Sequence, residues 1–174
     1  MGQRGNNPVH TNQHRNKRRR TQFGPARNFK QRLYGALDLG TNNCRLLVAR
    51  PAAEGFRVVD AFSRIVRLGE GVDGSLRLSE EAMKRTIAAL KVCADKMRRR
   101  KVTRARCVAT AACRRAENCD EFLKRVNQEA GLFIETISAE EEANLAVAAC
   151  RPLLAEEARF ALVFDIGGGS TELI

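Results

Sequence analysis

Two short stretches of the sequence combine an aspartate with a glycine-rich turn. "ALDLGTNN" covers residues 36–43 and "VFDIGGGST" covers residues 163–171, and both place an apolar run, Asp, one aliphatic residue and Gly in the same order. Glycines let backbone N–H groups come close to phosphate oxygens, and the hydroxyl and amide side chains that follow add hydrogen-bond donors. An aspartate at the end of a strand is suited to Mg²⁺ or its bound waters. The pair of turns predicts a phosphate-binding site whose aspartates can hold Mg²⁺.

A single turn of this kind more often has no ligand than binds phosphate. Two other phosphate-binding patterns are absent from the sequence. The Gly-Lys-Ser/Thr of a Walker loop does not occur, and no helix-forming run follows "GGGS" as a dinucleotide-binding motif requires. The aspartates expected to hold the metal are Asp38 and Asp165. The candidate phosphate ligands are Gly40, Thr41, Asn42, Gly167, Gly168, Gly169 and Ser170.

The elements that carry these turns alternate between strands and helices. Apolar residues at three- and four-residue steps predict a helix over about 80–100, with Ser79 as its N-cap. Two more helices are expected to begin after Asn118 and Ser138. The order β-β-β-α-β-α-β-α-β predicts an α/β fold with a mixed sheet, whose first three strands run in antiparallel succession. Apolar runs place the strands at 33–38, 44–50, 56–68, 104–110, 133–137 and 159–164.

The distribution of charge separates a basic N-terminal arm from a more balanced body. The formal net charge is +11, and residues 1–30 contain eight Lys and Arg residues and no acid. The arm has too few apolar residues to fold alone, so we expect it to be disordered. Its "NKRRR" run could bind nucleic acid, an anionic membrane or another polyanion, or could be a solvated arm without a fixed partner. No signal peptide or transmembrane segment is recognisable, which predicts a soluble, cytoplasmic protein.

The residue types available for catalysis are restricted. Both histidines, His10 and His14, lie in the basic arm, so an acid or base in the folded part has to be a carboxylate, Lys, Tyr or Cys. The six cysteines form no CxxC pair. Several of them lie in apolar runs, where a reduced cysteine acts as a small hydrophobic residue rather than as a metal ligand.

Five stretches of the sequence together resemble the Ppx/GppA family of exopolyphosphatases and guanosine pentaphosphate phosphatases. They are "ALDLGTNNCRLLVA", "LSEEAMKRTIAAL", "ATAACRRAENCDEFLKRV", "ISAEEEANLA" and "VFDIGGGSTELI", and they occur in the family's order between about Tyr34 and Ile174. The resemblance implies the ribonuclease H-like fold of the actin, Hsp70 and sugar-kinase superfold. We expect a disordered arm at 1–30, the phosphatase domain at 31–157, and at 158–174 the first strand of a second domain that continues beyond the chain.

The same resemblance implies hydrolysis of a terminal phosphate, from inorganic polyphosphate or from the 5′ end of guanosine pentaphosphate, assisted by Mg²⁺. Glu142 falls on the family's catalytic glutamate, which activates the attacking water. Arg114 matches a family arginine that points toward the phosphate site, and Glu172 matches an acidic position near the metal. Phosphoryl transfer mainly needs alignment and charge neutralisation, which amides, an arginine and Mg²⁺ can supply.

Several of these residues also have a purely structural interpretation. Glu141 can form a capping box with Ser138, and Glu140 favours the dipole of the same helix. Arg114 could be a surface charge, and Glu172 could be a strand residue that faces solvent. These alternatives stay open at the level of the sequence.

Two other classes of function are consistent with the same residues. One is a nonenzymatic phosphate or nucleotide sensor whose basic arm contacts nucleic acid, and the other is a kinase-like protein. Asn144 replaces a common family arginine, which leaves the preference between polyphosphate and guanosine pentaphosphate open. The resemblance also leaves a homodimer of the longer protein open. Because the superfold places its site between two domains, we expect residues 1–174 alone to show little or no turnover.

Overall fold

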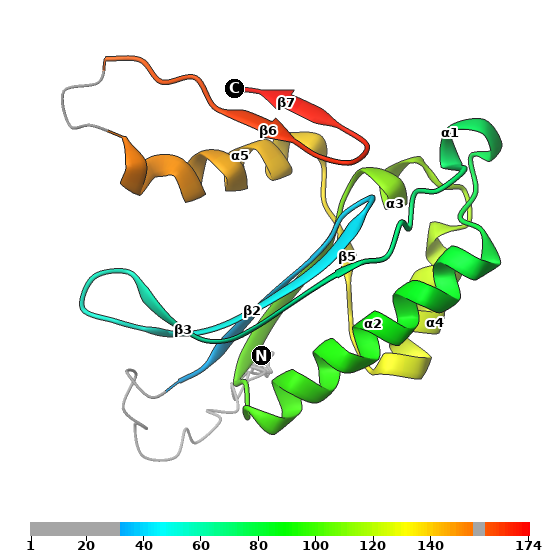
Figure 1. Cartoon of the computed structure of the whole chain (residues 1–174), viewed down its shortest axis with the longest axis horizontal. Coiled ribbons are helices and arrows are strands. Elements are labelled where there is room, and N and C mark those ends of the chain that lie inside the picture. Colours follow the sequence, from blue (N-terminus) through cyan, green and yellow to red (C-terminus); the bar gives the residue numbers. More distant parts are fainter. Residues whose placement is uncertain (1–31, 155–158) are drawn as a thin grey trace, which may run out of the picture.

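The computed structural model describes residues 32–154 and 159–174 as a five-stranded sheet with helices on both faces and a separate two-stranded hairpin (Figure 1). The expected disordered arm lies outside the described residues. The elements, in chain order, are β1 (Tyr34–Leu39), β2 (Asn43–Pro51), β3 (Phe56–Ile65), α1 (Val72–Ser75), α2 (Glu80–Arg99), β4 (Arg104–Ala109), α3 (Ala111–Arg115), α4 (Cys119–Ala130), β5 (Glu135–Thr136), α5 (Ala139–Cys150), the 3₁₀ turn η2 (Arg151–Leu153), β6 (Phe164–Ile166) and β7 (Thr171–Leu173).

The sheet has the strand order β3-β2-β1-β4-β5 and is mixed, as predicted. Strands β1, β2 and β3 are antiparallel neighbours, whereas β4 runs parallel to β1 and β5 runs parallel to β4. Because Leu39 lies opposite Ala109 in the parallel pair, β1 and β4 end at the same edge of the sheet. The turn after β1 and the segment after β4 are therefore brought together at this edge, where open α/β sheets commonly bind ligands.

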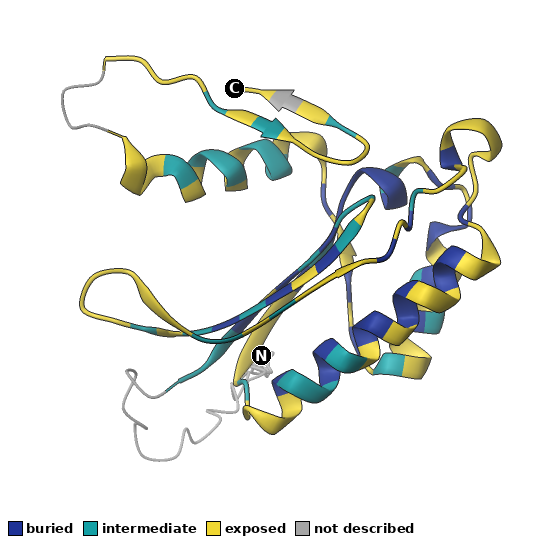
Figure 2. Cartoon of the chain, viewed as in Figure 1, coloured by how far each residue is buried: buried dark blue, intermediate teal, exposed yellow. Residues whose placement is uncertain are grey.

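One face of the sheet packs against α2 and α4 and forms the hydrophobic core. Figure 2 shows the buried residues gathered between the sheet and these two helices, whereas α5 and the β6–β7 hairpin are intermediate or exposed. The apolar stripe predicted for the helix over 80–100 is confirmed, because each of its residues is at most 9% exposed. These residues are Met83, Ile87, Leu90, Ala94 and Met97.

Several predicted strands are shorter in the structure. Strand β3 ends at Ile65 rather than at residue 68, because the backbone N–H groups of Val66 and Arg67 both donate to the carbonyl of Asn42. Strand β5 has only two residues, since it pairs only with the last two residues of β4. Strand β6 is also later and shorter than predicted, and within the described residues its only strand partner is β7.

Local structure also differs from the prediction at α1, α3 and the start of α4. The short helices α1 and α3 were not predicted. Asn118 occupies the N-cap position of α4, but its side chain makes no capping bond. Instead, its amide accepts from the N–H of Leu78 at 2.8 Å and donates to the carbonyl of Leu78 at 3.0 Å. Asn118 thus ties α4 to the segment that leads into α2.

None of the helices in the described part of the chain is both long enough and apolar enough to cross a membrane.

Candidate phosphate-binding and catalytic site

The two aspartate-glycine turns have the same backbone hydrogen bond. In the first loop (residues 38–42), the N–H of Gly40 donates to the carbonyl of Asn43 at 2.9 Å. In the second loop (residues 165–170), the N–H of Gly167 donates to the carbonyl of Ser170, also at 2.9 Å. The similarity seen between the two stretches of sequence is therefore a similarity of local structure.

The strands that flank the two loops repeat the same register as well. Asp38 of β1 lies opposite Arg45 of β2, and Asp165 of β6 lies opposite Glu172 of β7. In both hairpins the residue paired with the aspartate is seven positions further along the chain. The backbone of Glu172 is thus placed beside Asp165, where an acidic position near a metal was expected, although the structure describes nothing of its side chain.

The tips of the two loops are in direct contact. A Cβ atom on Gly168 would lie 2.3 Å from the side-chain nitrogen of Asn42, and a Cβ atom on Gly169 would lie 2.5 Å from the hydroxyl of Thr41. A Cβ atom at either position would force the Asn42 or Thr41 side chain to move, so glycine at both positions allows the loops to meet as they do.

Both loops line one polar cavity of about 160 Å³, which we call the inner chamber. Every predicted site residue of the two loops lines it, and so does Glu142 from α5. Arg114 does not, and for Glu172 only the backbone is described. The residues that line the chamber are Asp38, Gly40, Thr41, Asn42, Asn43, Arg45, Thr110, Glu142, Asp165, Ile166, Gly167, Gly168, Gly169 and Ser170.

Glu142 is held in place by Arg114. The Arg114 guanidinium donates to Oε2 of Glu142 at 2.7 Å, and the same nitrogen donates to the carbonyl of Ile137 at 3.1 Å. Both side chains are about four-fifths buried, with exposed fractions of 21% and 18%. The structure therefore places Arg114 against the candidate base, rather than on the wall of the inner chamber. Oε1 of Glu142 has no hydrogen-bond partner among the described residues and can accept a bond from water.

Helix α5 has no buried residue. It contacts the sheet through charged side chains. Arg106 of β4 donates to Oε1 of Glu135 at 2.6 Å and to Oε1 of Glu141.

The predicted capping box between Ser138 and Glu141 is only half formed. The N–H of Glu141 donates to the hydroxyl of Ser138 at 3.1 Å, but the Glu141 side chain pairs with Arg106 instead of returning to the cap.

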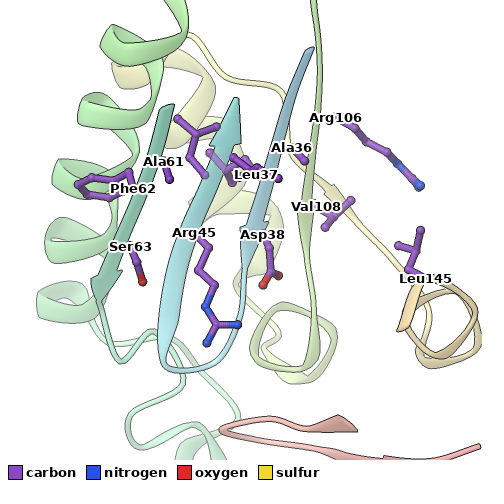
Figure 3. Close-up of a pocket in the computed structure, with 12 residues that line it drawn as sticks. Ala36, Leu37, Asp38, Arg45, Ala61, Phe62, Ser63, Arg106, Val108 and Leu145 are labelled. Carbon is purple, nitrogen blue, oxygen red and sulfur yellow. The ribbon is translucent and has the colours of Figure 1, made fainter. Parts of the chain in front are cut away.

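The sequence did not reveal Arg45 and Thr110 as residues of the inner chamber, or Arg106 as the partner of Glu141 beside it. Figure 3 shows Asp38 and Arg45 projecting from neighbouring strands and Arg106 pointing from β4 toward the helix that carries Leu145. The alternation of side chains along a strand would have placed Arg45 on the face of Asp38 once the register was known. No local pattern marks Thr110, which reaches the chamber because its N–H donates to the carbonyl of Leu39.

A larger cavity of about 650 Å³ lies beside the inner chamber, on the open face of the sheet (Figure 3). Its lining is mainly aliphatic, with Asp38, Arg45 and Arg106 at its polar margin. A phosphate group needs converging hydrogen-bond donors, which aliphatic side chains cannot provide. The smaller inner chamber is therefore the better candidate for phosphate binding.

The negative charge of Asp38 is unfavourable where it lies. Burial raises the pKa of Asp38 above its ordinary value, and the charges of Glu142 and Asp165 add to this rise. The guanidinium of Arg45 acts in the opposite direction but does not cancel it. Asp38, Glu142 and Asp165 line one small chamber, so a cation there would offset part of the repulsion that raises the pKa of Asp38.

Replacing Asp38 with asparagine is expected to raise Tm at pH 7 by about 2–4 °C in the absence of divalent cations. The raised pKa of Asp38 means that the native state binds more protons than the unfolded state between the two pKa values. Stability from this group is therefore lost as pH rises through that interval, and the advantage of the variant should shrink as pH falls toward 4. Thermal unfolding at several pH values measures this.

Asp95→Asn is the matched control, because Asp95 is a half-exposed partner of Arg98 on α2. Its Tm should equal that of the parent or fall slightly below it. An Asp38→Asn variant that unfolds at a lower temperature than the parent at pH 7 would show that the negative charge of Asp38 stabilises the fold.

Asp38 and Asp165 of the inner chamber fit a Mg²⁺ ion that takes its remaining oxygen ligands from elsewhere. Within residues 32–154 and 159–174, no group of three His, Cys, Asp or Glu side chains is placed to hold a metal by itself. Asp38 and Asp165 nevertheless line the same chamber. Mg²⁺ is usually held by one or two carboxylates together with substrate phosphates and water. These two aspartates are the residues that would hold it.

Comparison with known proteins agrees with this geometry. The model of the Ppx/GppA phosphatase family matches residues 47–174. A guanosine-5′-triphosphate,3′-diphosphate pyrophosphatase from Aeromonas hydrophila is 40% identical over 142 residues, which is 82% of this chain and 28% of that protein.

Solved structures show the same similarity. The Ppx/GppA family member from Aquifex aeolicus is 37% identical with a TM-score of 0.72, over 82% of this chain and 46% of that one. An exopolyphosphatase from Cytophaga hutchinsonii is 28% identical with a TM-score of 0.78, over 82% and 46% of the two chains. The chain thus spans less than half the length of these relatives. The chain belongs to the Ppx/GppA phosphatase family.

Proposed function

We propose that the protein is a phosphohydrolase that removes the terminal phosphate of inorganic polyphosphate or the 5′ phosphate of guanosine pentaphosphate. The observation that carries this proposal is the position of Glu142, which lines the same chamber as both glycine-rich loops. A site that only bound phosphate would need the loops but not a converging carboxylate. The chamber therefore favours hydrolysis over a nonenzymatic sensor of the same fold.

In the proposed reaction, the loops hold the terminal phosphoryl group and Glu142 activates water. Backbone N–H groups and the side chains of Thr41, Asn42 and Ser170 donate to the phosphoryl oxygens. Water donates a proton to the Glu142 carboxylate while its oxygen bonds to phosphorus, and the bond to the bridging oxygen breaks. Mg²⁺, when bound, neutralises charge on the phosphates.

Arg114 is proposed to act on this reaction through Glu142. Its guanidinium holds Oε2 of Glu142 and, through the carbonyl of Ile137, is anchored to the segment before α5. This arrangement fixes the carboxylate so that Oε1 is the oxygen available to water. Because an oriented base is more effective than a mobile one, the pair favours Glu142 as the base.

Measuring phosphate release by the full-length protein from long-chain polyphosphate, guanosine pentaphosphate and ATP tests the proposal. With Mg²⁺, at least one of the first two substrates should be hydrolysed faster than ATP. Each assay is run at two salt concentrations, because residues 1–30 carry eight basic residues that can bind any polyanion. Tight binding of these substrates without phosphate release would instead support a sensor. The cytoplasmic location and the homodimer stay predictions.

A further inference from the structure

Helix α5 carries the candidate base but adds no residue to the hydrophobic core. Each of its residues is intermediate or exposed (Figure 2), and Leu145, which lines the larger cavity, is 42% exposed. The last buried residue before the helix is Ile137, whose N–H donates to the carbonyl of Ala109 at 3.0 Å. Most helices are fixed in rotation by a buried apolar face, which α5 lacks. Its rotation therefore depends on polar contacts.

Two carboxylates in the first turn of α5 make these contacts. Arg114 of α3 donates to Oε2 of Glu142 at 2.7 Å, and Arg106 of β4 donates to Oε1 of Glu141. Within residues 32–154 and 159–174, no other side chain of α5 has an ion pair or a hydrogen bond with another element. The helix is thus held at two neighbouring positions by arginines from two separate elements.

Glu141 and Glu142 leave the helix in different directions. Consecutive residues of an α-helix are rotated by about 100° around its axis. A contact at Glu142 alone would let α5 rotate about that contact, whereas a second contact at Glu141 opposes this rotation. The two arginines together therefore define both the place of the first turn and its orientation.

Arg106 is itself held in place by a second carboxylate. Its Nε donates to Oε1 of Glu135 at 2.6 Å, while another guanidinium nitrogen donates to Glu141. Glu135 of β5 pairs with Val108 of β4, two residues after Arg106, so these three side chains lie on the same face of the sheet. Figure 3 shows Arg106 pointing from β4 toward the helix that carries Leu145. A planar guanidinium with several fixed donors is suited to bridge two carboxylates in this way.

We propose that Arg106 is a positioning residue for the hydrolytic reaction, because by holding Glu141 it fixes the rotation of α5 and so the direction of the Glu142 carboxylate. This inference rests on the proposed function, in which Glu142 is the base. Arg106 does not line the inner chamber, so it acts through α5 and not on the phosphoryl group. The side chains of Arg106 and Glu141 are 48% and 44% exposed, so their ion pair contributes little to the stability of the fold.

The test compares Arg106→Gln with the parent, both as full-length protein. Phosphate release should show kcat lowered by about 10–100-fold, because a displacement of about 1 Å in a catalytic site can cause a loss of this size. KM should stay within about threefold and Tm within about 2 °C. Arg106→Lys keeps the charge but not the planar fork, so it should recover part of kcat.

Arg104→Gln is the matched control, since Arg104 lies on the same strand, is exposed and has no ion pair among the described residues. Its kcat should equal that of the parent. Glu141→Ala should lower kcat by a factor similar to Arg106→Gln, and the double variant should show no further loss, because the two residues act as one unit. Losses that multiply in the double variant overturn the inference, and so does an unchanged kcat in Arg106→Gln.

Hydrogen exchange of the α5 amides tests the anchoring contact without relying on activity. Exchange should be faster in Arg106→Gln than in the parent and unchanged in Arg104→Gln, because a helix that loses an anchor opens more often. Equal exchange in Arg106→Gln and the parent would contradict the anchoring role. If the parent releases no phosphate, the proposed function fails by itself, and faster exchange in Arg106→Gln still shows that Arg106 holds α5 in place.

Discussion

Replacing Glu142 with glutamine in the full-length protein is expected to lower kcat for phosphate release by about 10²–10⁴-fold, the usual contribution of a general base. Glutamine keeps the shape of the side chain and can still accept a hydrogen bond from Arg114, but it cannot take a proton from water. Substrate binding should be retained or become tighter, because one negative charge beside the phosphates is lost. Glu142→Ala should abolish release with binding retained. Steady-state release assays and a substrate titration measure both quantities.

Glu140→Gln is the control for this experiment. Glu140 lies in the same first turn of α5, is exposed and does not line the inner chamber. Removing the charge of Glu140 should change kcat by less than about twofold, because an exposed charge that does not line the inner chamber contributes little. If Glu142→Gln releases phosphate as fast as the parent, the assignment of Glu142 as the base is wrong.

Replacing Gly168 with alanine is expected to lower kcat/KM by about 100-fold while leaving the core folded. The new Cβ would lie 2.3 Å from the side-chain nitrogen of Asn42 and 2.6 Å from its Cγ atom, so the loops must part or Asn42 must leave its position. A displacement of about 1 Å within a catalytic site is enough for a loss of this size. Tm should change by less than about 3 °C, because the second loop belongs to a hairpin with mostly exposed side chains.

Gly74→Ala is the matched control, since a Cβ atom on Gly74 meets nothing within 4 Å. This variant should have parental activity and equal or slightly higher stability. Gly168→Ala activity within threefold of the parent would contradict the contact between the loop tips. A fall in Tm similar to that of a core substitution would instead show that the hairpin is part of the stable fold.

Most of the fold could be predicted because its signals are local. The apolar stripe of α2, the cap at Ser79 and the antiparallel β1, β2 and β3 each depend on residues close together in the chain, and all three are confirmed. The predictions fail where a strand depends on its partner. Strand β5 is short because only Glu135 and Thr136 pair with β4, and composition cannot reveal how far such a pairing extends.

The residues of the candidate site show the same difference between local and long-range signals. Asp38 and the glycines of both loops are recognisable from the order of residue types, because a close approach to phosphate demands small residues beside an acid. The partners of Glu141 and Glu142 are not recognisable in this way. Arg106 and Arg114 lie 35 and 28 residues away from them, and many other arginines have similar neighbours in the sequence.

The chemistry of the two loops can thus be predicted from short stretches of sequence, since each loop is a hairpin whose turn and register depend on adjacent residues. The contact between the two loops cannot be predicted in this way. Gly168 touches Asn42, Glu142 lines the same chamber, and Arg106 holds Glu141 beside it. These contacts join residues that lie far apart in the sequence, in some cases by more than a hundred positions. Such contacts are decided by strand order and by the direction of side chains, which exist only once the chain has folded.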